Sequence, residues 1–493
     1  MVFKKYEVDD VLYFGIALGL LLRWSTSTFS YSGADKPPMY GDYEAQRHWM
    51  EITINLPVKE WYQNSTKNDL LYWGLDYPPL TAYHSLLCGY IAQWFDKSWV
   101  ALKTSRGYES YDHKIFMRAT VILADILIYI PAIILYWTRI SKPYRLREKA
   151  IAATITLLYP GFILIDHGHF QYNCISLGLC LWAIFFLIED MDLVGAIAFT
   201  LALNYKQMEL YHAFPFFFYL LGKCRQQPFS EGIKKIIQLA LVVILTTAVC
   251  WAPFLRDFQS VIQVVHRLFP FARGLYEDKV ANVWYCLSVF IKLKQLFSVS
   301  TLALISGITT LTVLLPSMLH LLHHPSIPIF RLSLVNSSLI FFLCSYQVHE
   351  KSILLAALPA LLLIDDYPVE ILWFLNISTF SMFPLISKDR LTIPYFALSV
   401  LFFIGTFKGM GLDITFKKRS LKNLLFILSI LGGLLLNISA FIVKPPAHYP
   451  HIHSLLNAVY SCIHFIGFAV YFQYVQWNHP YPNTTRLKEK KSS

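Results

Sequence analysis

Long runs of apolar residues recur along the chain, separated by short polar stretches. A helix needs about 20 apolar residues to cross the hydrocarbon core of a bilayer, within a range of about 17–25. By this measure the sequence predicts an all-α protein with about 14 transmembrane spans. The predicted spans are 10–27, 115–137, 150–166, 173–189, 192–204, 209–222, 236–254, 300–322, 330–347, 352–366, 369–384, 394–411, 422–443 and 454–476.

Three of the apolar stretches depart from a simple crossing. The spans at 192–204 and 209–222 are too short to cross straight, which predicts a hairpin of tilted or broken helices. The stretch 283–297 is apolar but interrupted by Lys292 and Lys294, so it is expected at the membrane interface.

Composition agrees with a membrane protein. Of the residues, 56% are apolar and 15% are charged, whereas a soluble domain has roughly 45–50% apolar and about 25% charged residues. A soluble enzyme, a disordered protein and a secreted disulfide scaffold are therefore excluded. The net charge is +11. In a membrane protein, excess Lys and Arg are expected in cytoplasmic loops. Nucleic-acid binding is not expected, because no soluble basic domain is present to hold nucleic acid.

The short basic loops all fall on one side of the membrane when the N-terminus is placed in the cytoplasm. They centre on 139–149, 223–235 and 417–422, and a basic tail follows at 486–491. Cytoplasmic loops are enriched in Lys and Arg, so this arrangement supports an even number of spans. The last four residues, Lys490–Ser493, resemble the dilysine retrieval signal of endoplasmic reticulum membrane proteins. We therefore predict a multi-pass protein of that membrane.

Six polar clusters fall on the opposite, lumenal side. Convergence of polar loops on one side of the membrane is what an active site at the membrane surface would need. The clusters are GDYEAQRHW at 41–49, WGLDYPP at 73–79, DHGHFQYN at 166–173, NYKQME at 204–209, the charged residues between 267 and 279, and VHEKS at 348–352.

The first lumenal loop, residues 28–113, is far too long to be a connector, since loops beyond about 12–15 residues are usually functional or disordered. Its many tryptophans and tyrosines argue against disorder, so we expect interfacial amphipathic helices. The sequon at Asn64 lies in this loop and is a predicted glycan site. The diproline at 78–79 makes a rigid turn, which either aims Asp76 at a site or begins a helix.

These motifs resemble those of the dolichyl-phosphate-glucose-dependent glucosyltransferases of the endoplasmic reticulum. The resemblance runs from about residue 23 to 400, and beyond that it extends only to hydropathy. It favours the branch that adds the first glucose to the lipid-linked precursor of N-glycans, because NYKQMELYHA and LYEDKVAN depart from the sibling branch that adds the second. The motifs, in order, are GDYEAQRHW, YWGLDYPPLTAYH, DHGHFQYN, NYKQMELYHA, RLFPFARGLYEDKVANVW and QVHEKSILL.

The resemblance implies a GT-C-type fold and an inverting transfer of glucose from dolichyl-phosphate-glucose. The implied acceptor is the terminal mannose of the nine-mannose oligosaccharide on dolichyl pyrophosphate, and the new bond is an α-1,3 linkage. The expected partners are this donor, this acceptor and membrane lipids, without nucleic acid or cofactor. The predicted regions are 1–27 (N-terminus and first span), 28–113 (lumenal loop), 114–400 (transmembrane core) and 401–493 (last spans and basic tail).

Asp42 is the predicted general base. An inverting displacement needs a carboxylate that activates the attacking hydroxyl on the face opposite the leaving group. The family's functional aspartate lies in the motif that begins Gly41-Asp42 here. The alternative is an N-cap for the helix that starts in this motif. Asp76 and Glu44 are weaker candidates for a direct role.

Positive donors can stabilise the departing phosphate without protonating it. By topology the candidates for this role are His349, Lys351, Lys206, Arg267 and Arg273. Of these, His349 also resembles a family position near the donor phosphate, although a single loop histidine can be structural. The two arginines could instead reach lipid headgroups, and Lys206 could pair with a glutamate three residues later. The remaining substrate-binding candidates are His167, His169, Gln171, Tyr205, Gln207 and Glu209.

No metal is expected in the reaction. The acidic pair in Asp190-Met191-Asp192 falls on the cytoplasmic side, where it is interpreted as a solvated turn. His448, His451 and His453 lie in a proline-rich loop, where a metal site is the lesser interpretation. The eight cysteines show no CxxC spacing and are predicted to be small core residues, with a disulfide or metal site as the alternative.

Two other functions remain open at this stage. One is the same chemistry with another dolichyl-phosphate sugar, or the sibling reaction that adds the second glucose. The other is a polyprenol-lipid transporter, although transporters place polar sites near the midplane of the membrane, often between repeats. The polar clusters of this chain lie instead at the lumenal ends of its spans.

Overall fold

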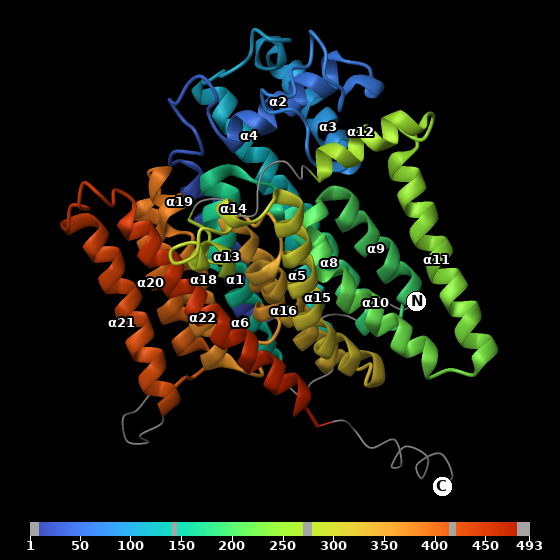
Figure 1. Ribbon diagram of the computed structural model, residues 1–493, viewed down its shortest axis with the longest axis vertical. Coiled ribbons are helices and arrows are strands. Elements are labelled where there is room, and N and C mark those ends of the chain that lie inside the picture. Colours follow the sequence, from blue (N-terminus) through green and yellow to red (C-terminus); the bar gives the residue numbers. More distant parts are fainter. Residues whose placement is uncertain (1–8, 141–144, 270–278, 414–420, 481–493) are drawn as a thin grey trace.

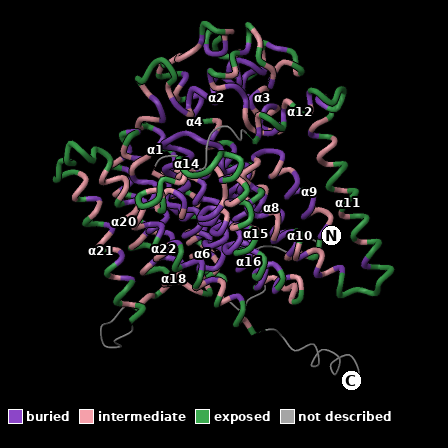
Figure 2. The backbone as a smooth tube through the Cα atoms, in the orientation of Figure 1, coloured by how far each residue is buried: buried purple, intermediate pink, exposed green. Residues whose placement is uncertain are grey.

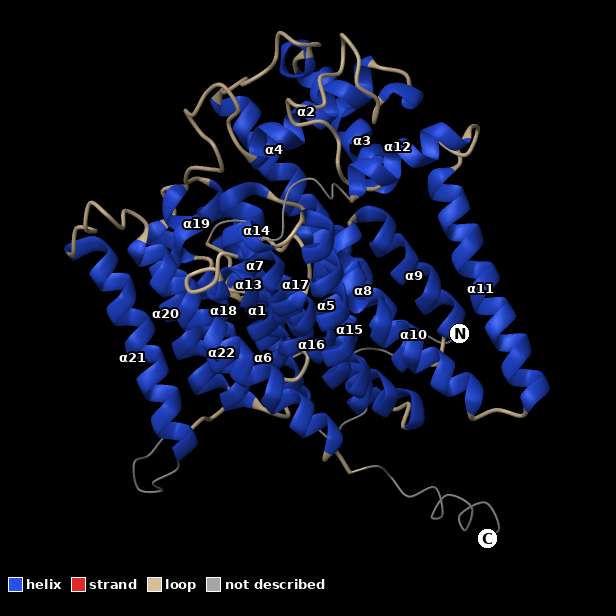
Figure 3. Cartoon of the chain, viewed as in Figure 1, coloured by secondary structure: helices blue, strands red, loops and turns tan. Residues whose placement is uncertain are grey.

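The computed structural model describes residues 9–140, 145–269, 279–413 and 421–480. Within these ranges every regular element is a helix (Figure 3). Long helices form a bundle, and a smaller helical layer built mainly from residues 28–110 covers one end of it (Figure 1). The prediction of an all-α fold is confirmed.

Each predicted span corresponds to a helix of the bundle or to a series of helical segments. Among the described residues, eight helices are long and apolar enough to cross a membrane, so a protein with several spans is confirmed and the total of fourteen stays a prediction. The bundle helices are α1 (Asp10–Ser27), α4 (Tyr111–Ala124), α5 (Ile130–Arg139), α6 (Leu146–Leu157), α7 (Pro160–Phe162), α8 (Asn173–Ile188), α9 (Asp192–Tyr205), α10 (Leu210–Arg225), α11 (Phe229–Trp251), α15 (Val299–His323), α16 (Ile327–Cys344), α17 (Leu354–Leu361), α18 (Pro368–Ser381), α19 (Phe383–Lys388), α20 (Thr392–Gly409), α21 (Leu421–Ile442) and α22 (Ile452–Trp477).

Burial follows the position of each helix in the bundle. In α16, 83% of the residues in its 18-residue apolar stretch are buried. In α11 the corresponding share is only 6%. Figure 2 shows the buried residues gathered in the centre and the exposed ones along α11 and α21 at the edges. Apolar helices that expose their side chains in this way are suited to contact with lipid.

Two of the long helices contain π-helical segments. In the first, α4 and α5 are joined by η3 (Asp125–Tyr129), and in the second, α6 and α7 continue into η4 (Ile163–Phe170). The π-helical turn is rare and is frequent at functional sites. These two segments contact each other, since His167 Nε2 lies 2.6 Å from Asp125 Oδ2.

The covering layer, which we call the cap, is held together by its own ion pairs. It contains α2 (Asp42–Asn55), η1 (Val58–Glu60), α3 (Pro79–Phe95) and η2 (Lys97–Val100), with α12 (Phe258–Leu268) beside them. Arg47 on α2 is fully buried and binds both Glu44 and Glu51 at 2.7 Å. The prediction of helices in the long loop is confirmed.

The two short spans, the stretch 283–297 and the diproline form the following structures. The short spans form a hairpin in which η5 (Gln207–Glu209) joins α9 to α10. The stretch 283–297 forms two short helices, α13 (Val283–Leu287) and α14 (Leu293–Leu296), and not a crossing. Pro79 is the first residue of α3, so the diproline does begin a helix. All eight cysteines are free, and seven of them are buried.

Candidate active site

A cavity of about 260 Å³ lies between the cap and the end of the bundle. It is lined by polar residues from separate segments of the chain, so the predicted convergence of polar clusters is confirmed. The first long loop and the loop at 348–352 both border this cavity. The candidate residues that line it are Asp42, Asp76, Gln171, Lys206, Arg267, His349 and Lys351.

Asp42 is the first residue of α2, and its carboxylate faces the cavity. The helix cap is Gly41, and it makes no side-chain capping bond. The Asp42 carboxylate instead accepts hydrogen bonds from Gln171 Nε2 and Lys351 Nζ, and from His169 Nε2 at 3.0 Å. The alternative interpretation of Asp42 as an N-cap is therefore wrong.

The charges around Asp42 keep it ionised. Burial alone would raise its pKa, but Lys351 and His169 hold the pKa well below the usual value. All three donors contact Oδ2, and none of the bonds that the described residues make to this carboxylate ends on Oδ1. Oδ1 is thus the oxygen that remains for a hydroxyl in the cavity.

The backbone turn at Phe170 places two of these donors. Phe170 ends η4 with a positive φ of 90°, which is rare for a bulky residue and is a sign of strain held at a functional site. The residues on either side of it, His169 and Gln171, both donate to Asp42. On its other side, His169 Nδ1 lies 2.5 Å from Oδ2 of Asp389.

Asp389 was not among the residues that sequence reasoning selected. It follows α19, and the buried carboxylate comes from a short stretch between two apolar helices. The topology predicted from the basic loops would place Lys388, Asp389 and Arg390 on the same side as the other polar clusters. That placement was the signal available in the sequence.

Lys206 and Arg267 line the same cavity as Asp42. Lys206 Nζ donates to Asn173 Oδ1 at 2.6 Å and lies over the ring of Tyr77. Burial, aided by repulsion from Lys351, lowers the pKa of Lys206 to about 8. The Arg267 guanidinium donates to two backbone carbonyls of the cap, at 2.6 and 3.1 Å. Arg273 lies outside the described residues.

The structure corrects the placement of six predicted site residues. None of them lines the cavity, and each has partners inside the protein. All are buried except Gln207, which is half-buried. Glu44 is bound by Arg47 and by the hydroxyl of Tyr72. His167 is bonded to Asp125 within the bundle. The six are Glu44, His167, His169, Tyr205, Gln207 and Glu209.

Tyr205 and Gln207 stabilise the packing around the cavity and do not line it. The hydroxyl of Tyr205 lies 3.1 Å from His84 Nδ1. The amide of Gln207 donates to the backbone carbonyls of Asp76 and Leu268, at 3.0 and 3.3 Å. Gln207 therefore connects the bundle to the cap and to α12.

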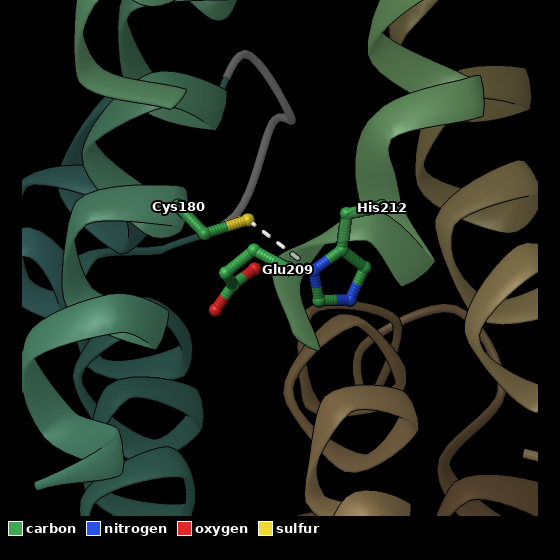
Figure 4. A group of neighbouring side chains, drawn as sticks. All are labelled: Cys180, Glu209 and His212. Atoms are coloured by element: carbon green, nitrogen blue, oxygen red, sulfur yellow. Dashed lines mark hydrogen bonds and ion pairs between the residues drawn. The ribbon is translucent and has the colours of Figure 1, made fainter. Parts of the chain in front are cut away.

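Glu209 belongs to a buried group with Cys180 and His212 (Figure 4). One ligand atom from each lies within 4.8 Å of the others, a spacing that could hold a metal ion. His212 Nε2 must donate to the carbonyl of Leu355 at 2.8 Å, which leaves Nδ1 facing Glu209 Oε2 at 2.7 Å. One proton between His212 Nδ1 and Glu209 Oε2 satisfies these two atoms without a metal ion.

Two other predicted alternatives are settled by the contacts. Lys206 binds Asn173 and not the glutamate three residues away. The acidic pair Asp190 and Asp192 is bound by Lys223, at 3.0 and 2.8 Å, and does not line the cavity. Asp190 is exposed, as a solvated turn predicts, but Asp192 is buried at the start of α9, so that interpretation is wrong for Asp192.

Comparison with known proteins places the chain among glycosyltransferases. Residues 15–471 match the family described as "ALG6, ALG8 glycosyltransferase family". A Gallus gallus protein named "Dolichyl pyrophosphate Man9GlcNAc2 alpha-1,3-glucosyltransferase" is 49% identical, and the match covers 93% of this chain and 95% of the relative. A Drosophila melanogaster protein named as a probable enzyme of the same kind is 48% identical, with 92% of this chain and 96% of the relative covered.

One solved structure also matches over most of the chain. It is ArnT from Cupriavidus metallidurans bound to undecaprenyl phosphate, with 12% sequence identity and a TM-score of 0.40. The match covers 94% of this chain and 77% of the ArnT chain.

Proposed function

Because this chain belongs to the ALG6, ALG8 glycosyltransferase family, we propose that it adds glucose to the Man9GlcNAc2 oligosaccharide of dolichyl pyrophosphate. The donor is dolichyl-phosphate-glucose, and the product carries an α-1,3-linked glucose on a terminal mannose. The observation that carries this proposal is the ionised Asp42, whose Oδ1 remains available in a cavity that cationic side chains also line.

In the proposed reaction Asp42 is the general base. Its Oδ1 takes the proton of the acceptor hydroxyl while the hydroxyl oxygen bonds to the anomeric carbon of glucose. The bond from that carbon to the phosphate oxygen breaks on the opposite face, so a β-linked donor gives an α-linked product.

The cavity cations stabilise the phosphate as it leaves. Lys351, Lys206 and His349 line the same cavity as Asp42 and can neutralise the charge that develops on dolichyl phosphate. Because a lipid phosphate needs no proton when such donors hold it, the reaction needs no general acid.

We place this site on the lumenal side of the endoplasmic reticulum membrane, where the donor and acceptor lipids are embedded. Support comes from the basic loops, which the positive-inside rule assigns to the cytoplasm. Asn64, the sequon in the cap, is exposed, as a glycan site must be.

The direct test is a reconstituted reaction. Purified protein is incubated with each dolichyl-phosphate sugar and with Man9GlcNAc2 or Glc1Man9GlcNAc2 lipid, and products are read by mass. We expect one hexose to be added to Man9GlcNAc2 from the glucosyl donor only. Addition to the Glc1 acceptor alone would indicate the sibling reaction, and lipid translocation without product would indicate a transporter.

We expect turnover to be independent of divalent metal, because the departing phosphate already faces cationic side chains. Protein washed in excess EDTA should keep nearly all of its activity in the same assay. Metal analysis of the washed protein is the control, since it shows that any ion was removed. Loss of activity that manganese or magnesium restores would contradict the prediction.

The low pKa of Lys206, about 8, predicts a basic limb in the pH profile. Only charged Lys206 can hold phosphate, so kcat/KM for the donor should fall as pH rises through about 8. Lys206→Arg remains charged at every accessible pH, so the limb should move to higher pH. A basic limb that is the same in both proteins would exclude Lys206 from phosphate binding.

A further inference from the structure

A second carboxylate, that of Asp389, lies behind Asp42 and does not line the cavity. Its Oδ2 is 2.5 Å from His169 Nδ1, and the other ring nitrogen of His169 is 3.0 Å from Asp42 Oδ2. The side chains of His169 and Asp389 are each only 3% exposed. One buried imidazole therefore bridges two carboxylates from distant parts of the chain.

The bridge fixes the protonation of His169. Ionised carboxylate oxygens only accept hydrogen bonds, so the ring bonds both of them only when both of its nitrogens carry a proton. A charged ring is disfavoured by Lys351, whose Nζ lies 3.2 Å from Nε2. Asp389 supplies the second negative charge, so two carboxylates balance the ammonium and the imidazolium in a site with little water.

A doubly protonated ring cannot take a further proton, so His169 is not the base. Its role in this geometry is to hold Oδ2 of Asp42 in place and leave Oδ1 toward the cavity. We propose that Asp389 is a positioning residue for glucosyl transfer, which keeps His169 charged and oriented so that Asp42 is held ready for the acceptor hydroxyl. The proposal rests on the proposed function, because it needs Asp42 to be the base.

The stretch around Asp389 is fixed on both sides. The backbone carbonyl of Lys388 accepts a bond from Lys36 Nζ at 3.2 Å. Leu391 packs so closely on Gly168 that a Cβ at Gly168 would lie 2.7 Å from Leu391 Cδ1. Asp389 is therefore held against the π-helical segment that carries His169, as a residue that orients a ring must be.

Asp389→Asn keeps the shape of the side chain and removes its charge. We expect kcat to fall by about 10²-fold, the loss typical of a displaced catalytic group, while the KM values for donor and acceptor change little. Asp389→Glu restores the charge and should recover part of the lost rate. The matched control is Asp35→Asn, which removes an exposed ion pair with the neighbouring Arg390 and should leave kcat unchanged.

A double-mutant cycle separates positioning from a purely structural role. If Asp389 acts through Asp42, then Asp389→Asn should cause no further loss in protein that already carries Asp42→Asn. The proposal is overturned if Asp389→Asn is fully active while Asp42→Asn is slow, if the two losses multiply, or if Asp389→Asn lowers the melting temperature and Asp389→Glu recovers no rate. Full activity of Asp42→Asn would instead reject the base itself, and this proposal with it.

Discussion

Asp42→Asn should lower turnover by about 10²–10⁴-fold, the usual contribution of a general base. Asparagine has almost the same shape and can still accept from Lys351 and His169, but it cannot take a proton from the acceptor hydroxyl. Binding of both substrates should therefore change little. The measurement is steady-state transfer of glucose to Man9GlcNAc2 lipid, with substrate binding followed separately.

The matched control is Asp76→Asn, because Asp76 lines the same cavity, whereas the Lys351 and His169 side chains donate to Asp42. It should retain most of its activity and a normal melting temperature. Normal turnover of Asp42→Asn together with a slow Asp76→Asn would move the base to Asp76. Normal turnover of both variants would reject base catalysis by either carboxylate.

Arg47→Met should destabilise the protein by about 3–5 kcal/mol, the usual result of removing one partner from a buried ion pair. Arg47 is fully buried, and its loss would leave Glu44 and Glu51 without their cation. For a chain of 493 residues the unfolding entropy is about 1 kcal/mol per degree, so the melting temperature should fall by about 3–5 °C. The measurement is thermal unfolding of the purified protein in detergent.

The comparison variant is Arg390→Met, which removes an arginine that is 66% exposed from its pair with Asp35. Exposed pairs are usually worth only about 0–1 kcal/mol, so its melting temperature should hardly change. Equal melting temperatures for Arg47→Met and the unaltered protein would show that the cap does not depend on this ion pair.

The same ion pair makes the stability of the cap sensitive to acid. Burial opposes ionisation of Glu51, but a bond from His48 and the charge of Arg47 lower its pKa to about 2. A depressed pKa gives stability that is present above the unfolded value and is lost as pH falls through the folded value. Unfolding should therefore become easier as pH falls from about 4.5 toward about 2.

The general arrangement was predictable because it follows from hydropathy and charge. Each predicted span corresponds to helical structure, and the basic loops alone predicted which polar clusters would share a side. That reasoning brought Asp42 and Lys351 to one cavity although 309 residues separate them. A π-helical turn leaves no such periodic pattern, so η3 and η4 were not predicted.

Individual roles were harder to predict, because a polar motif contains both cavity residues and their buried supports. Glu44 and Asp42 lie in the same short motif, yet only Asp42 faces the cavity, since the other carboxylate is bound by Arg47. His167 and His169 differ in the same way, through their partners in the bundle. Such choices depend on partners that sequence spacing does not reveal.

The distance in sequence between Asp42 and its partners also determines when the site can form during biosynthesis. Asp42 leaves the ribosome before its partners, and its ammonium partner is made 309 residues later. At about 5–20 residues per second this interval lasts roughly 15–60 s. During that time the carboxylate lacks the ammonium group that holds it, so the growing chain has no assembled active site until its second half is inserted in the membrane.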